Sequence, residues 1–211
     1  MTSGLSNYSL MTCTFNNNAM TCGMLLSFKT FIKANIPLFI IDNGTTELAS
    51  PFMKKTFHVF DNSNYKFTKN YPCRSRTHAE AIEYALKHVI NTKYVLLCDN
   101  DIIFKPKIQL LLNAPFEPFD AIGEIGYDLV PPNRLFPYFC IINVEKLKTE
   151  NISYNRFIGH GTHDTGCSFL EDIQAANWKI KPIKLDDYIY HLKGGTLHGK
   201  NYIQWLKTLY K

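Results

Sequence analysis

Short apolar segments recur along this chain, and each of them stops abruptly at a polar residue. The polar residues that follow these segments are Asn16, Asp42, Asp61 and Asp99. Between the segments lie stretches with helical spacing, at Ala19–Asn35 and after a capping box formed by Thr77 and Glu80. Apolar strands that alternate with helices are typical of a parallel sheet covered on both faces. The sequence therefore predicts an α/β fold with a central, mostly parallel twisted sheet flanked by helices.

The pattern becomes more irregular after Pro106, where prolines divide the chain into short pieces. In this half we expect two helices, at Thr165–Ala176 and Tyr202–Tyr210, and three strands, at Tyr138–Val144, Lys179–Ile183 and Tyr188–His191. The sequence contains no internal repeat, low-complexity tract or linker. We therefore expect one domain over residues 1–211, with a nucleotide-binding half at about 1–104 and a second half at about 105–211.

Composition excludes several classes of protein. A hydrophobic content of 45% is enough for a core and excludes intrinsic disorder. The net charge of +5 suits an anionic small molecule as well as a nucleic acid, but the basic residues are scattered as on an ordinary solvated surface, and we expect no nucleic-acid partner. None of the cysteines forms a C-x-x-C pair, and no apolar run reaches the ~20 residues that cross a bilayer. We expect a cytoplasmic protein without a membrane anchor.

Two acids, Asp99 and Asp101, follow the apolar strand Tyr94–Cys98 with a single residue between them, and apolar residues resume at Ile102. The alternative to a binding site is a turn in which Asp99 caps the strand and Asp101 is exposed. Two close carboxylates at the end of a buried strand are better explained by a divalent cation, because Mg²⁺ and Mn²⁺ share carboxylate oxygens with substrate phosphates. Asp99 and Asp101 are therefore predicted to be metal ligands.

The order of these features resembles the GT-A glycosyltransferases. The likeness rests on the strand–helix first half, the Asp99-x-Asp101 motif, and the late His191-x-x-Gly194 segment after a short strand. It covers the whole chain in size and order. In residues 8–18, 38–44 and 74–104 the chain is most similar to viral and bacterial members, and it resembles the N-terminal domain of a large chlorovirus glycosyltransferase that modifies a capsid protein. That resemblance implies that the chain is one module of a longer protein.

The resemblance implies a metal-dependent enzyme that moves a sugar from a nucleoside-diphosphate sugar, most simply a UDP-sugar, to a glycan or glycoprotein. His191 would be a third metal ligand beside Asp99 and Asp101, with Mn²⁺ favoured and Mg²⁺ possible. Asp164 would face the acceptor hydroxyl, in the second, acceptor-binding half. The residues implied in donor binding are Thr14, Phe15, Asn16, Asp42, Arg76, Asp99, Asn100 and Lys200.

Two of the donor-binding assignments have an alternative explanation in the sequence. Asp42 precedes Asn43-Gly44 and is also a good turn former, and Arg76 competes with Arg74 as a partner of the diphosphate.

The His191-x-x-Gly194 pattern favours retention of anomeric configuration slightly over inversion. A nucleotidyltransferase, another metal-dependent phosphoryl enzyme, or a module that binds nucleotide sugars without catalysis remain alternative functions.

Overall fold

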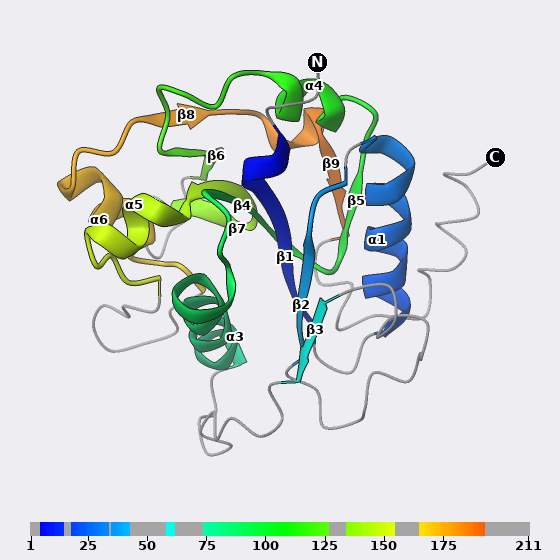
Figure 1. Cartoon of the computed structure of the whole chain (residues 1–211), viewed down its shortest axis with the longest axis horizontal. Coiled ribbons are helices and arrows are strands. Elements are labelled where there is room, and N and C mark those ends of the chain that lie inside the picture. The colour runs from blue at the N-terminus through cyan, green and yellow to red at the C-terminus, as the bar shows by residue number, and fades with distance from the viewer. Residues whose placement is uncertain are drawn as a thin grey trace.

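The structure, a computed structural model, describes residues 5–14, 18–33, 35–42, 58–61, 74–126, 134–154 and 165–192 (Figure 1). The strands are β1 (Tyr8–Thr14), β2 (Leu38–Asp42), β3 (His58–Asp61), β4 (Tyr94–Asp99), β5 (Ile102–Phe104), β6 (Ala121–Gly126), β7 (Arg134–Asn143), β8 (Ile180–Pro182) and β9 (Ile189–His191). The α-helices are α1 (Asn18–Phe31), α3 (Arg74–Tyr84), α4 (Ile108–Asn113), α5 (Val144–Thr149) and α6 (Phe169–Ala175). Three shorter turns are η1 (Leu5–Asn7), η2 (Ala85–Val89), which is π-helical and continues α3, and η3 (Leu185–Asp187).

Seven of the strands form one sheet in the order β3-β2-β1-β4-β7-β6-β8. Pairing is parallel between β3, β2, β1 and β4 and again between β6 and β8, whereas β7 runs antiparallel to both of its neighbours. The predicted, mostly parallel sheet is therefore confirmed. Because β1 to β4 run in the same direction, the acidic residues that end β2, β3 and β4 (Asp42, Asp61 and Asp99) lie at one edge of the sheet, where ligands bind in open α/β folds.

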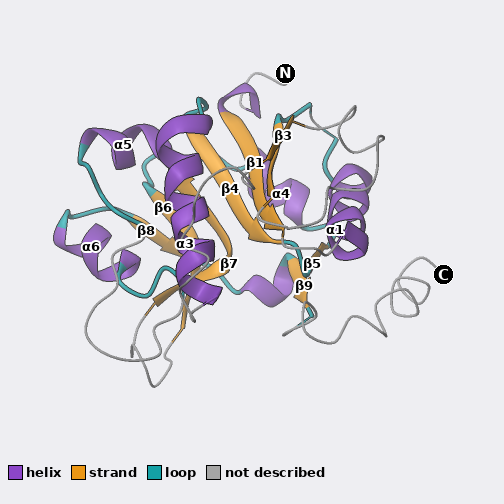
Figure 2. Cartoon of the chain, turned by 90° about the horizontal axis from the view of Figure 1, so that it is seen from below, coloured by secondary structure: helices purple, strands orange, loops and turns teal. Residues whose placement is uncertain are grey.

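Helices cover both faces of this sheet, as Figure 2 shows. Side chains alternate across each strand, so Leu10 and Met11 of β1 enter different cores. On one face Leu10 packs with residues of α1, including Met24 and Phe28. On the other face Met11 packs with residues of α3 and α6, including Ile82. This burial on two sides explains why the parallel strands are apolar along their whole length.

A second, two-stranded sheet carries the end of the described chain back to the main sheet. Strands β5 and β9 pair antiparallel, with Ile102 opposite His191 and Phe104 opposite Ile189. Ile102, Phe104 and Ile189 belong to the same core as α1, which fixes the small sheet against the large one. Among the helices that the structure describes, none combines the length and the apolar character needed to cross a bilayer.

Some predicted boundaries differ from the structure. Helix α3 begins at Arg74, so Thr77 and Glu80 lie inside the helix and the predicted capping box is wrong, and Arg76 is part of the helix instead of preceding it. The strand expected to continue to Val144 ends at Asn143, because the Asn143 side chain accepts a hydrogen bond from the Lys146 backbone N–H (3.0 Å) and starts α5. The predicted helix at Tyr202–Tyr210 lies outside the described residues.

Candidate metal centre

Two carboxylates are presented at the edge of the sheet by the connection from β4 to β5. Asp99 is the last residue of β4, and Asp101 lies in the turn just before β5 begins at Ile102. The side chain of Asp99 is partly exposed (27%), whereas Asp101 is buried, with 5% of its surface exposed. A buried carboxylate is costly unless a cation or hydrogen-bond donors compensate its charge. The position of Asp101 therefore demands a partner.

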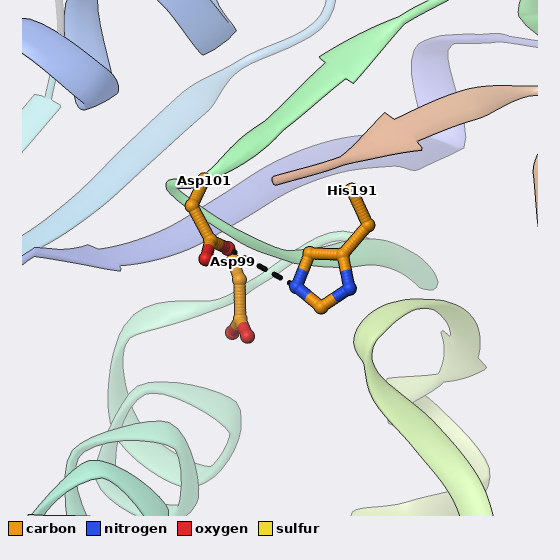
Figure 3. Close-up of side chains that lie close together, drawn as sticks. All are labelled: Asp99, Asp101 and His191. Carbon is orange, nitrogen blue, oxygen red and sulfur yellow. Dashed lines mark ion pairs between the residues drawn. The ribbon is translucent and has the colours of Figure 1, made fainter. Parts of the chain in front are cut away.

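The third member of the site comes from the far end of the described chain. His191 is the last residue of β9, and the β5–β9 pairing places it opposite Ile102, next to Asp101. The backbone N–H of Leu192 donates to the carbonyl oxygen of Asp101 at 2.9 Å and fixes this register. Figure 3 shows the His191 imidazole turned toward the two carboxylates, with its Nε2 atom 3.4 Å from Oδ1 of Asp101.

The three side chains fit a divalent cation. One ligand atom from each of Asp99, Asp101 and His191 lies within 4.8 Å of the others. Among the residues that the structure describes, no hydrogen-bond donor satisfies the buried Oδ1 atom of Asp101. Two carboxylates and one imidazole give a net charge of −2 with neutral histidine, and this donor set suits Mn²⁺, for which an imidazole is a better ligand than it is for Mg²⁺. The arrangement can hold a cation and leave coordination positions for a phosphate.

The residue between the two acids anchors their turn. Asn100 is buried (4% exposed), and its Nδ2 atom donates to Oγ1 of Thr14 and to Oγ1 of Thr21, at 3.3 Å each. Thr21 in turn donates to Thr14 at 2.9 Å. This buried set of hydrogen bonds ties the Asp99–Asp101 turn to the end of β1 and to the first turns of α1. Asn100 and Thr14, both predicted to bind the donor, thus also set the position of the carboxylates.

An aromatic column on β7 supports the imidazole from the other side. The Tyr138 ring stacks on the His191 ring with centroids 4.0 Å apart and an interplanar angle of 17°. Phe136 stacks on Tyr138 with centroids 4.9 Å apart. Gly126 of β6 makes room for this column, because a Cβ atom there would lie 2.0 Å from the Phe136 ring. The ring of His191 is therefore held by packing before any cation arrives.

The stacking predicts a contrast between two substitutions of Tyr138. Tyr138→Phe keeps the aromatic face and should bind Mn²⁺ as the parent does, whereas Tyr138→Leu should weaken Mn²⁺ binding by roughly 10-fold, the lower end of what loss of a residue supporting a metal ligand costs. Isothermal titration with Mn²⁺ measures this, and thermal unfolding of the metal-free proteins serves as the control for folding. Equal Mn²⁺ affinity for the leucine and phenylalanine variants would contradict a positioning role.

A second histidine lies on the opposite side of Asp99. His78 of α3 places its Nε2 atom 3.7 Å from Oδ1 of Asp99, while its Nδ1 atom lies 3.2 Å from the hydroxyl of Thr165. In sequence His78 is only a polar residue facing this end of the sheet, and Tyr138 looks like one more residue of an apolar strand. No sequence signal connects either of them to the metal ligands. Their places depend on how α3 and β7 pack.

Cysteines near the site are not competing ligands. Cys13, Cys98 and Cys140 lie on the adjacent strands β1, β4 and β7 and are buried. Burial, and next the negative charge of Asp99, raise the pKa of each of these thiols well above its ordinary value. Because the thiolate is the metal-binding form, these cysteines stay protonated small core residues.

The other residues predicted for the site are only partly placed. Asp42 ends β2, and its backbone is level with Thr14 of β1, so it reaches the same edge of the sheet. Arg76 lies in the first turn of α3. The side chains of Asp42 and Arg76 fall outside the described part of the structure. The remaining predicted residues, Phe15, Asn16, Asp164 and Lys200, lie wholly outside it, as does Gly194 of the His191-x-x-Gly194 segment.

No family model and no curated protein matches this sequence. Solved structures do match its fold. A TarS fragment from S. aureus aligns with a TM-score of 0.57 at 14% identity, over 87% of this chain and 60% of its own. A mannosyltransferase from Pyrobaculum calidifontis, solved with GDP-Man and Mn²⁺, aligns with a TM-score of 0.57 at 10% identity, over 84% of this chain and 54% of its own.

A Drosophila galactosyltransferase 7 mutant, solved with manganese, UDP-Gal and xylobiose, aligns with a TM-score of 0.53 at 14% identity. That alignment covers 92% of this chain and 73% of the other. By contrast, this chain spans only 60% of the TarS fragment and 54% of the mannosyltransferase. At these identities the likeness shows the fold, which is the GT-A fold predicted from the sequence.

Proposed function

We propose that this protein is a metal-dependent glycosyltransferase that moves a sugar from a UDP-sugar to a glycan or glycoprotein. One observation carries the proposal: Asp99, Asp101 and His191 come together within 4.8 Å at the carboxyl edge of the sheet of a GT-A fold. Neighbours of this fold were solved with nucleotide sugars and Mn²⁺, namely GDP-Man in one and UDP-Gal in another. The donor set of the cluster suits the same cation.

Each residue of the site has a proposed part in the reaction. Asp99, Asp101 and His191 would hold the cation, which when bound neutralises negative charge on the departing nucleoside diphosphate. Asn100 and Thr14 hold the two carboxylates in place through their buried hydrogen bonds. Arg76 and Lys200 are proposed to add positive charge to the diphosphate, and Phe15, Asn16 and Asp42 to contact the nucleoside. The acceptor side of the site has its own proposed residue.

On that side we propose that Asp164 orients the acceptor hydroxyl. In an inverting reaction Asp164 would also remove the hydroxyl proton as a general base. In a retaining reaction, which the His191-x-x-Gly194 resemblance favours, the departing phosphate can take that proton. The acceptor-binding half is proposed to be residues 105–211. From the sequence resemblance we further propose that the acceptor is a glycan of a viral capsid protein, made in the host cytoplasm.

The experiment that tests this function is a panel of nucleotide sugars incubated with the protein, Mn²⁺ and a mixture of glycan acceptors. We expect release of UDP from one UDP-sugar, and no release when Mn²⁺ is chelated. Tight Mn²⁺-dependent binding of a nucleotide sugar without any release would indicate a binding module instead. Release of pyrophosphate from a nucleoside triphosphate and a sugar phosphate would indicate a nucleotidyltransferase.

A further inference from the structure

We propose that His78 is a positioning residue that holds Asp99 for the cation and links it to Thr165. The inference rests on the proposed metal site and adds a residue outside it. His78 lies on α3, Asp99 ends β4, and Thr165 lies just ahead of α6. Three elements that are distant in sequence therefore meet at one carboxylate of the metal centre. His78 contacts both Asp99 and Thr165.

The two ring nitrogens of His78 face different partners. Its Nδ1 atom is 3.2 Å from the hydroxyl of Thr165, which is buried at 3% exposure. Its Nε2 atom is 3.7 Å from Oδ1 of Asp99. The first distance is that of a long hydrogen bond, and the second exceeds the usual limit of about 3.2 Å. Catalytic hydrogen bonds are often long in empty sites and tighten when the site is filled, and we expect the contact between His78 and Asp99 to shorten in this way.

His78 lies too far out to be a ligand itself. The ligand atoms that fall within 4.8 Å of one another belong to Asp99, Asp101 and His191, and His78 is not in this group. His78 therefore acts through Asp99. Carboxylates that bind metals are themselves hydrogen-bonded, and such partners tune affinity by roughly 10- to 100-fold.

The direction of the hydrogen bonds follows from the chemistry of the three groups. Asp99 as a metal ligand is ionised and only accepts hydrogen bonds. His78 must then present an N–H at Nε2, which both the neutral Nε2–H tautomer and the imidazolium provide. In the neutral tautomer Nδ1 is an acceptor, and the Thr165 hydroxyl donates to it. The chain of donors thus runs from Thr165 through His78 to Asp99, and it fixes one orientation of the carboxylate.

Replacing His78 by glutamine or asparagine separates its two contacts. A glutamine amide occupies the position of Nε2 and can still donate to Asp99, whereas an asparagine amide occupies the position of Nδ1 and reaches only toward Thr165. We expect His78→Gln to bind Mn²⁺ nearly as tightly as the parent and His78→Asn to bind roughly 10- to 100-fold more weakly. Thr165→Val, which removes the hydroxyl that orients the ring, should give a smaller loss.

Mn²⁺ affinity is measured by electron paramagnetic resonance of the free ion, on the full chain and without a nucleotide sugar. His88→Asn is the matched control, because His88 is an exposed histidine that continues from the same helix. Circular dichroism establishes that each variant is folded. Parent-like Mn²⁺ affinity in His78→Asn would overturn the role of His78, as would equal losses in the glutamine and asparagine variants.

Two further outcomes separate this inference from the proposed function. No Mn²⁺ binding by the parent protein would overturn the metal site and the role of His78 together. Unchanged Mn²⁺ affinity in His78→Asn, combined with a raised KM for the nucleotide sugar, would overturn the positioning role and assign His78 to substrate contact. The proposed glycosyltransferase activity would stand in that second case.

Discussion

Replacing Asp101 by asparagine is expected to reduce sugar transfer by at least about 100-fold, to the level seen in excess chelator. Charge stabilisation by a catalytic metal is worth several kcal/mol, and each 1.36 kcal/mol is tenfold in rate. Asp101 is the most buried of the three ligands, with 5% of its surface exposed, so water cannot replace its carboxylate. Asparagine keeps the shape of the side chain and removes only the charge that attracts the cation.

Asp101→Asn is expected to lose activity but not thermal stability in the metal-free protein. Asp99 and Asp101 lie close together and repel each other in the metal-free protein. Asp101→Asn should therefore unfold at an equal or higher temperature than the parent without metal, and gain nothing when Mn²⁺ is added. Asp187→Asn is the control, because Asp187 is exposed and pairs with Lys107 at the surface (3.3 Å). Full activity of Asp101→Asn in the presence of chelator would contradict the metal mechanism.

Replacing His191 by alanine should change which cation the site prefers. Loss of an outer partner of a metal ligand already costs roughly 10- to 100-fold, and loss of the ligand itself should cost Mn²⁺ affinity at least as much. The carboxylates that remain form an all-oxygen set, which Mg²⁺ accepts as readily as before. We therefore expect the ratio of Mn²⁺ to Mg²⁺ affinity to fall in His191→Ala.

Competition titrations with the two ions, with fluorescence or calorimetric detection, measure this ratio. His88→Ala is the matched control for loss of a histidine away from the site. An unchanged ratio in His191→Ala would show that the imidazole is not a ligand, and that its contact with Asp101 at 3.4 Å is only an ion pair. The Asp99 and Asp101 carboxylates would then be the whole protein contribution to the site.

The parallel strands of the core could be predicted because each has a recognisable sequence pattern. Strands buried on two faces are apolar throughout, and the step from apolar to acidic at Asp99 marks where β4 leaves the core. Strand β6 gave no such signal, since it contains glycines and Glu124 and is interrupted by an irregularity between Gly123 and Ile125. Gly126 in that strand is explained only by the Phe136 ring that lies against it. Contacts of this kind arise from packing and leave no periodic pattern.

The two carboxylates of the candidate site could be predicted from the local sequence, whereas the histidine could not. Asp99 and Asp101 are separated by one residue in the sequence, and the repulsion between two close carboxylates at the end of a buried strand is what predicted a cation there. His191 is close to them only because β5 pairs with β9, which no local pattern specifies, so family resemblance was needed to suggest it. The supporting contacts of Tyr138 and His78 join elements across the sheet, and they could be found only once the chain was folded.

Calorimetric titration of UDP into the parent protein and into Asp101→Asn, with and without Mn²⁺, tests the proposed metal site directly. We expect the parent to bind UDP tightly only when Mn²⁺ is present, because a cation held by Asp99, Asp101 and His191 would join the protein to the diphosphate. Asp101→Asn should bind UDP weakly under both conditions. UDP binding by the parent that does not depend on Mn²⁺, or that survives unchanged in Asp101→Asn, would contradict the proposed metal site.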